Sequence, residues 1–172
     1  MSGATPMPGQ ICYTPIGVIH SEHCIPENTP IQPVYAEGCT GRAELGPEYA
    51  GGLKDLEGFS HLILLYHFHR AGNARLTVQP FTDNIPRGIF STRHPQRPNP
   101  IGISVVRLVR IEGTTIYLKD VDILDGSPLL DIKPYIPRFD RVENPRGGWT
   151  EQVDEETARQ RGRRGFRGRG NS

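Results

Sequence analysis

The apolar residues of this chain fall in short runs that glycines and prolines separate, a pattern typical of many short strands. The longest run, residues 59–69, is apolar on both faces through Leu65 and predicts a central strand. Glu112-Gly113 is a candidate hairpin turn, and Pro134 interrupts the last strand candidate. The other strand candidates are residues 16–20, 39–45, 76–81, 88–92, 103–111, 115–124 and 129–136.

Helical periodicity is weak. Tyr49, Leu53 and Leu56 follow Pro47 at helical spacing, which favours a short helix over residues 47–57 that Gly58 ends. Residues 151–160 are a second short candidate. Six to eight strands with one or two short helices predict a mainly-β fold. Because closure removes exposed edges, we expect a small antiparallel β-barrel, closed or nearly closed.

The 172 residues suit one domain of ordinary size. We expect a disordered leader over residues 1–10, the barrel domain over 11–145, a linker or short helix over 146–158 and a disordered Arg/Gly-rich tail over 159–172. The N-terminus has neither the charged nor the apolar region of a signal peptide, and no apolar run can span a bilayer. These features predict a soluble protein without a membrane partner.

The net charge of +1 hides two oppositely charged parts. Residues 159–172 hold six arginines and no acid, which leaves 14 basic and 19 acidic residues in the rest of the chain. Arginines contact phosphates and stack on bases without a fold, so the tail is either an RNA contact or a solubilising extension. Cys12, Cys24 and Cys39 form no Cys-x-x-Cys pair. We therefore expect no disulfide framework, no metal site and a reducing, cytoplasmic location.

The segment 87–104 is the most unusual of the chain. Arg87, Arg93 and Arg97 lie among three prolines and two glycines, and no acid occurs between residues 84 and 111. A stiff backbone that carries planar, five-donor side chains favours a ligand-binding loop over a merely rigid surface loop.

A second polar segment covers residues 125–135. Asp125-Gly126-Ser127-Pro128 has the composition of a turn, with glycine supplying a positive φ. Asp131 and Lys133 share one strand face, where they form a surface ion pair or line a polar cavity. The histidines of residues 61–69 lack metal-ligand spacing and are expected in the core or a cavity wall. Glycine-rich nucleotide loops and the Gly-x-Ser-x-Gly motif are absent, which argues against Rossmann, P-loop and α/β-hydrolase folds.

Four ordered segments resemble one known family. Residues 92–102, Thr-Arg-His-Pro-Gln-Arg-Pro-Asn-Pro-Ile-Gly, resemble its Thr-Arg-Ser-x-x-Arg-Pro-Asn-Pro-Ile-Gly element. Residues 125–135 resemble its Asp-Gly-Thr-Pro-x-x-Asp-Ile-Lys-Pro-Tyr element, and residues 15–21 and 59–62 also match. Over roughly residues 13–140, the chain is similar to the TsaA-like family, also called TrmO or YaeB-like.

The resemblance implies a β-barrel homodimer that uses S-adenosylmethionine to methylate N6 of threonylcarbamoyladenosine, next to the anticodon of tRNA. It implies that the cofactor lies near the subunit boundary. Ile31 stands where the family commonly has arginine, and the chain lacks the C-terminal domain of larger members. The implied cofactor contacts are Pro30, Ile31, Gln32, His69, Arg70, Arg93, Ile103, Asp125, Gly126, Ser127 and Pro128.

The acceptor nitrogen of such a substrate is a poor nucleophile, so a base that removes its proton would help. Asp131 is the candidate base, with Lys133 and Tyr135 orienting the substrate. Arg97 and Asn99 are candidates for holding the threonyl carboxylate or a tRNA phosphate. The alternatives are a non-catalytic S-adenosylmethionine- or RNA-binding module and a methyltransferase with a different acceptor.

Overall fold

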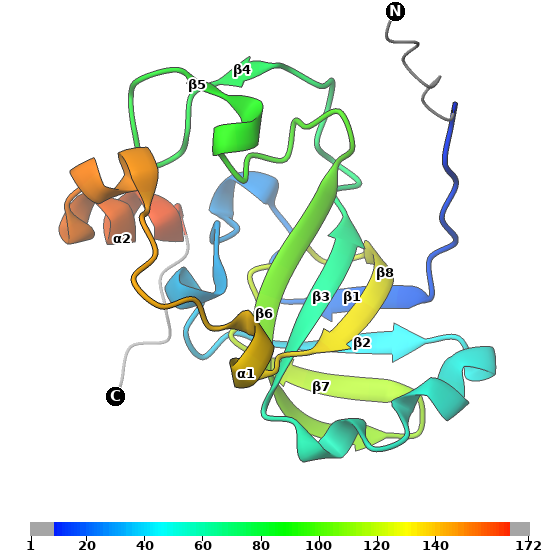
Figure 1. Cartoon of the computed structure of the whole chain (residues 1–172). Coiled ribbons are helices and arrows are strands. Elements are labelled where there is room, and N and C mark those ends of the chain that lie inside the picture. Colours follow the sequence, from blue (N-terminus) through cyan, green and yellow to red (C-terminus); the bar gives the residue numbers. More distant parts are fainter. Residues whose placement is uncertain (1–8, 166–172) are drawn as a thin grey trace, which may run out of the picture.

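The structure, a computed structural model, describes residues 9–165 and is built on a closed barrel of six antiparallel strands (Figure 1). The order around the barrel is β1-β2-β7-β6-β3-β8, and β8 pairs with β1 to close it. The expected mainly-β barrel is therefore confirmed. Its strands are β1 (Gly17–Ser21), β2 (Thr40–Leu45), β3 (His61–His67), β6 (Ile101–Glu112), β7 (Thr115–Lys119) and β8 (Ser127–Pro134).

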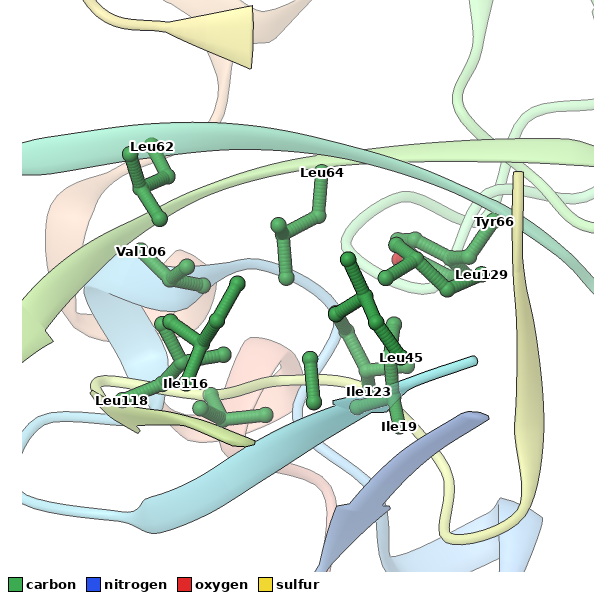
Figure 2. Packing of buried hydrophobic residues seen from close by; sticks show 12 residues of the cluster. Ile19, Leu45, Leu62, Leu64, Tyr66, Val106, Ile116, Leu118, Ile123 and Leu129 are labelled. Atoms are coloured by element: carbon green, nitrogen blue, oxygen red, sulfur yellow. The ribbon is translucent and has the colours of Figure 1, made fainter. Parts of the chain in front are cut away.

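Alternate residues of each strand point into the barrel. On β3, Leu62, Leu64 and Tyr66 are buried, whereas Ile63 and Leu65 between them are partly exposed on the outer surface. The both-sided burial expected for this strand is thus incomplete, because the barrel interior lies on one side only. Figure 2 shows the buried side chains of β3 meeting those of the facing strands. This single core holds the barrel together.

Local backbone constraints explain where the expected elements differ from the observed ones. Residues 47–57 form two 3₁₀ segments, Pro47–Leu53 and Leu56–Gly58, rather than an α-helix. Gly51-Gly52 lowers helix propensity there, and Asp55 adopts a left-handed φ of 65°. Strand β7 ends at Lys119 rather than at residue 124, because Asp120 has a φ of 61°.

The excursion between β3 and β6 contains little regular structure. Of the expected strand 76–81 only β4 (Thr77–Val78) forms, and it pairs with β5 (Arg87–Gly88). Residues 88–92 do not form a strand, since Ile89–Ser91 is a 3₁₀ turn. The last strand, β8, extends to Pro134, so this proline ends the strand rather than breaking it. Further 3₁₀ turns cover Pro26–Asn28 and Pro33–Tyr35.

The chain continues beyond the barrel into helical segments. These are α1 (Pro137–Asp140), a 3₁₀ segment (Gly148–Gln152) and α2 (Glu155–Arg163). We call residues 147–165 the C-terminal strap. Its helix α2 lies beside the β4–β5 excursion rather than on the barrel wall (Figure 1), and several of its residues line the cavity described below. Residues 159–163, which were expected to be disordered, are helical. The expectations for residues 1–8 and 166–172 lie outside the described residues.

Within residues 9–165 no helix is long and apolar enough to cross a membrane.

Candidate functional site

A cavity of about 1160 Å³ opens at one end of the barrel, between the barrel rim, the β3–β6 excursion and the C-terminal strap. The end of β3, the start of β6 and the turn before β8 meet here. A typical small-molecule site has a volume of roughly 300–1,000 Å³, so this cavity has room for two reactants. Predicted site residues in its wall are Pro30, Ile31, Gln32, His69, Arg70, Arg93, Arg97, Ile103 and Ser127.

Gln32 and Arg93 join two loops across the cavity wall. The Arg93 guanidinium donates a hydrogen bond of 2.6 Å to Gln32 Oε1, and the Gln32 amide donates to the Ile31 carbonyl. The Ile31 amide in turn donates to the carbonyl of Gly162 in the strap at 2.9 Å. The backbone of Ile31, a position where the family resemblance implies an arginine, and the side chains beside it are therefore anchored by hydrogen bonds.

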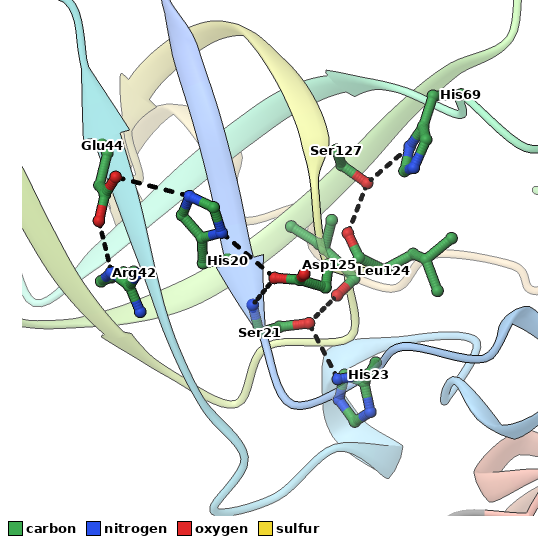
Figure 3. Close-up of polar contacts among 10 residues, drawn as sticks. His20, Ser21, His23, Arg42, Glu44, His69, Leu124, Asp125 and Ser127 are labelled. Atoms are coloured by element: carbon green, nitrogen blue, oxygen red, sulfur yellow. Dashed lines mark hydrogen bonds and ion pairs between the residues drawn. The ribbon is translucent and has the colours of Figure 1, made fainter.

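The turn before β8 is fixed to β1 by the carboxylate of Asp125. This group accepts a hydrogen bond of 3.0 Å from the Ser21 amide and lies 3.3 Å from His20 Nδ1 (Figure 3). Gly126 has a φ of 78°, which confirms the need for glycine in this turn. Asp125, Gly126 and Pro128 do not line the cavity, whereas Ser127 does. In this structure Asp125 positions the turn, and Ser127 contributes the polar group.

Ser127 and His69 face each other in the cavity wall (Figure 3). The Ser127 hydroxyl donates to the Leu124 carbonyl at 2.7 Å, so its oxygen is left to accept from His69 Nδ1 at 3.3 Å. Burial, followed by the nearby charge of Arg70, lowers the pKa of His69. The imidazole is therefore neutral near pH 7 and presents Nε2 as an acceptor.

Arg97 reaches the cavity wall but also braces its own loop. Its Nη1 lies 2.6 Å from the Thr92 carbonyl oxygen and 3.3 Å from that of Ile89. The other predicted substrate residues, Asn99, Lys133 and Tyr135, do not line the cavity. Asp131 does not line it either, and its carboxylate pairs with Lys133 Nζ at 2.7 Å on the outer face of β8. The structure thus leaves the predicted base and its neighbours outside the cavity.

The pattern of residue types missed a buried network in the cavity wall. Asp122 Oδ1 accepts a hydrogen bond of 2.6 Å from the Ser104 hydroxyl, whose oxygen lies 3.1 Å from the Tyr66 hydroxyl. Burial raises the pKa of Asp122 to about 7 and also raises that of Tyr66. Gly102 faces the Tyr66 ring so closely that a Cβ there would overlap it. The network therefore depends on this glycine.

The strap adds an aromatic and cationic wall that was also missed. The rings of Phe81 and His94 stack with centroids 5.0 Å apart, and the Arg164 guanidinium lies 4.4 Å from the Phe81 centroid. Trp149 donates from its indole nitrogen to the Ser91 carbonyl at 2.8 Å. Burial and three arginine charges lower the pKa of His94. This wall is suited to flat, electron-rich or anionic groups.

A possible metal-ligand group lies away from the cavity wall. Potential ligand atoms of Glu22, His23 and Cys39 lie within 4.8 Å of one another. Burial and the bond to Glu22 raise the pKa of the Cys39 thiol to about 12. Because a thiol ligates metals as the thiolate, a metal that bound to this group would have to displace the Cys39 proton.

Comparison with known proteins connects this site to a family. The profile of the tRNA-methyltransferase O N-terminal domain matches residues 18–141. A probable S-adenosyl-L-methionine-binding protein of Pyrococcus abyssi is 56% identical over 146 residues, which cover 85% of this chain and 79% of that protein. Human tRNA (adenine(37)-N6)-methyltransferase is 39% identical over 79% of this chain and 32% of its own length.

Solved structures give the same result. The crystal structure of TrmO from Pseudomonas aeruginosa superposes with a TM-score of 0.69 at 38% identity, covering 82% of this chain and 63% of that one. The chain thus spans most of the archaeal relative, a third of the human one and under two thirds of the crystallised TrmO. By the match over residues 18–141 and these identities, the chain belongs to the tRNA-methyltransferase O N-terminal domain family.

Proposed function

We propose that this protein is an S-adenosylmethionine-dependent methyltransferase that methylates N6 of threonylcarbamoyladenosine next to the anticodon of tRNA. The observation that supports the proposal is the cavity that brings together the 92–102 motif, Ser127 of the 125–135 motif, residues 30–32 and the end of β3. Relatives named as an S-adenosylmethionine-binding protein and as a tRNA (adenine(37)-N6)-methyltransferase supply the cofactor and the class of acceptor. The free cysteines Cys12, Cys24 and Cys39 support a cytoplasmic location.

The residues of the cavity fit the cofactor chemically. S-adenosylmethionine needs an apolar surface for its adenosine, hydrogen-bond partners and a cation for its carboxylate. Phe68 and Leu124 supply apolar walls, the His69–Ser127 pair supplies polar atoms, and Arg70 and Arg93 supply positive charge. When bound, the cofactor contributes a methyl group on an already activated sulfonium. The protein therefore needs mainly to place the acceptor nitrogen in line with that methyl group.

The positive wall suits an acceptor with a carboxylate. Arg70, Arg97 and Arg164 line the cavity, and the threonyl group would bring an anion that a guanidinium can bind with two hydrogen bonds. Arg97 keeps further donors beyond the Nη1 that braces its loop, so it stays our candidate for this contact. The exposed Phe90 and the Arg87–Trp149 pair, 5.2 Å from guanidinium carbon to ring centroid, suit neighbouring unpaired bases.

We further propose that the protein acts as a homodimer through the outer face of β6. Ile101, Ile103 and Val105 are 40%, 44% and 38% exposed in alternate positions, and Ile63 and Leu65 of β3 lie beside them in register. An apolar stripe of this kind favours a protein partner. Because Ile101 and Ile103 also line the cavity, a second copy would lie at its mouth.

The test is a transfer assay with purified protein, methyl-labelled S-adenosylmethionine and tRNA that carries or lacks the threonylcarbamoyl group. We expect label only on the modified tRNA. Label on the unmodified tRNA would instead indicate a different acceptor, and cofactor binding without transfer would indicate a non-catalytic module. Arg97→Ala should weaken methylation more than cofactor binding, and an equal loss of both would contradict its role at the substrate.

A further inference from the structure

One carboxyl group in the cavity wall, that of Asp122, lies outside both family motifs. Asp122 lies just after β7, is only 6% exposed, and lines the cavity together with Tyr66. The Ser104 hydroxyl gives its hydrogen to Asp122 Oδ1, so the Tyr66 hydroxyl must donate to Ser104. The three side chains form a directed chain of hydrogen bonds that ends at the carboxylate.

We propose that Asp122 is the base of the methyl transfer and accepts the proton that leaves the acceptor nitrogen. This inference rests on the proposed function. In the reaction the nitrogen forms a bond to the methyl carbon, and the carbon–sulfur bond breaks with its electron pair passing to sulfur. The N–H proton passes to a carboxylate oxygen of Asp122 and later to solvent, so atoms and charge balance.

The surroundings of Asp122 suit a base that works near neutral pH. The Arg93 charge from the 92–98 loop acts on Asp122, and the Asp122 charge in turn raises the pKa values of Tyr66 on β3 and Cys39 in the segment before β2. Burial raises the pKa of Asp122 to about 7, while the Ser104 hydrogen bond and the Arg93 charge oppose the rise. A carboxylate held near the working pH is both present and basic enough to take a proton.

The other candidate bases in the cavity wall are less suitable. Burial, followed by nearby arginine charges, lowers the pKa of both His69 and His94, which makes each imidazole a weaker base than usual. Glu155, the second acid among the described wall residues, is exposed in the first turn of α2. The Arg93 charge also lowers the pKa of Asp122, because it stabilises the ionised carboxylate, but at Asp122 the effect of burial is larger and leaves a stronger base than an ordinary aspartate.

The decisive variant is Asp122→Asn, which preserves shape and leaves an oxygen to accept from Ser104. We expect S-adenosylmethionine affinity, measured by titration calorimetry, to stay within about threefold of the wild type. The single-turnover rate on modified tRNA should fall about 10²- to 10⁴-fold, the usual range for losing a general base. The wild-type rate should rise with pH and level off above about 7, and the variant should lose this step. Asp55→Asn, an exposed substitution outside the cavity, is the matched control.

Two further measurements keep the proposal testable if Asp122→Asn folds poorly. Ser104→Ala keeps the carboxyl group but removes a bond to its charged form, so the pH–rate step should move to higher pH. Carbon-13 NMR of the cofactor-free wild type should show the Asp122 carboxyl titrating near pH 7. A titration near the ordinary aspartate value would overturn the proposal.

The other possible results of these experiments also test the role of Asp122. An unchanged rate in Asp122→Asn, or a loss of rate that falls on Asp131→Asn instead, would refute the role of Asp122 alone. A parallel loss of cofactor affinity and rate would assign Asp122 to cofactor binding rather than to proton transfer. Absence of transfer by the wild type would overturn the proposed function, and this inference with it, before any variant is made.

Discussion

At the scale of single residues, burial of an acid ties stability to pH. Asp122 is a core-like position filled by a carboxyl group, and its pKa of about 7 lies well above the ordinary value of 3.8. The folded state therefore binds this proton more tightly than the unfolded state. Between about pH 4 and pH 7 the folded protein loses stability as pH rises, and above pH 7 the whole cost remains.

We predict that Asp122→Asn flattens this dependence. From pH 5 to pH 8 the wild type should lose about 2–3 kcal/mol of unfolding free energy through this one group, since each pKa unit corresponds to about 1.4 kcal/mol. Urea denaturation of both proteins at the two pH values measures the difference. Asp55→Asn should retain the wild-type slope. If Asp122→Asn also retains it, the carboxyl group is ionised at pH 5 and the pKa is not raised.

At the scale of elements, hydrophobic alternation predicts the barrel strands well, because the pleat places every second side chain in one core. Leu62, Leu64 and Tyr66 satisfy this rule along β3. The rule fails at residues 121–123, where three consecutive side chains are buried after the left-handed Asp120. Because residues 115–124 are predicted as one long strand, the sequence pattern gives no sign that Asp122 is buried in the core.

The C-terminal strap could not be predicted for a different reason. Its anchors are contacts between residues far apart in the chain, such as Arg164 with the Phe81 ring and with the Pro26 carbonyl. Arginine and glycine composition alone favours disorder, whereas these contacts with distant residues stabilise the helical segment. The residues 30–32, 69–70 and 93, which the family resemblance implies as cofactor contacts, line the same cavity.

We predict that weakening α2 loosens the cavity wall. Asp154 caps the helix by accepting from the Thr157 amide at 2.9 Å, and Gly162 near its end accepts from the Ile31 amide. Asp154→Ala should speed hydrogen exchange of the Ile31 amide several-fold and weaken S-adenosylmethionine binding. Asp140→Ala removes a comparable side-chain bond at α1, which does not line the cavity, and should change neither. Unaltered exchange at Ile31 would show that the strap does not order the 30–32 segment.

At the scale of the whole molecule, the cavity is built from the family domain and from residues that follow it in the chain. The family match ends at residue 141, yet Trp149, Val153 and Arg164 of the strap line the same cavity as the motif residues. The barrel brings the motifs together at its rim, and the strap covers the side that the barrel leaves open. The exposed Ile101 and Ile103 of β6 also line this cavity, so whatever covers the outer face of β6 would lie beside its mouth.

We predict that Val105→Glu separates the proposed dimer. The substitution places a charge in the middle of the β6 stripe, where pairing with a second copy would remove it from water at high cost. Light scattering should show about twice the chain mass of 19.2 kDa for the wild type and a single chain for the variant. Cofactor affinity should fall as well, because Ile101 and Ile103 at the mouth lose their cover.

Val18→Glu is the matched control, since Val18 has the same 38% exposure on β1, which does not adjoin β6 in the barrel. A monomeric wild type would contradict the proposed dimer. A dimer that survives Val105→Glu but not Val18→Glu would place the subunit boundary at β1 rather than at β6.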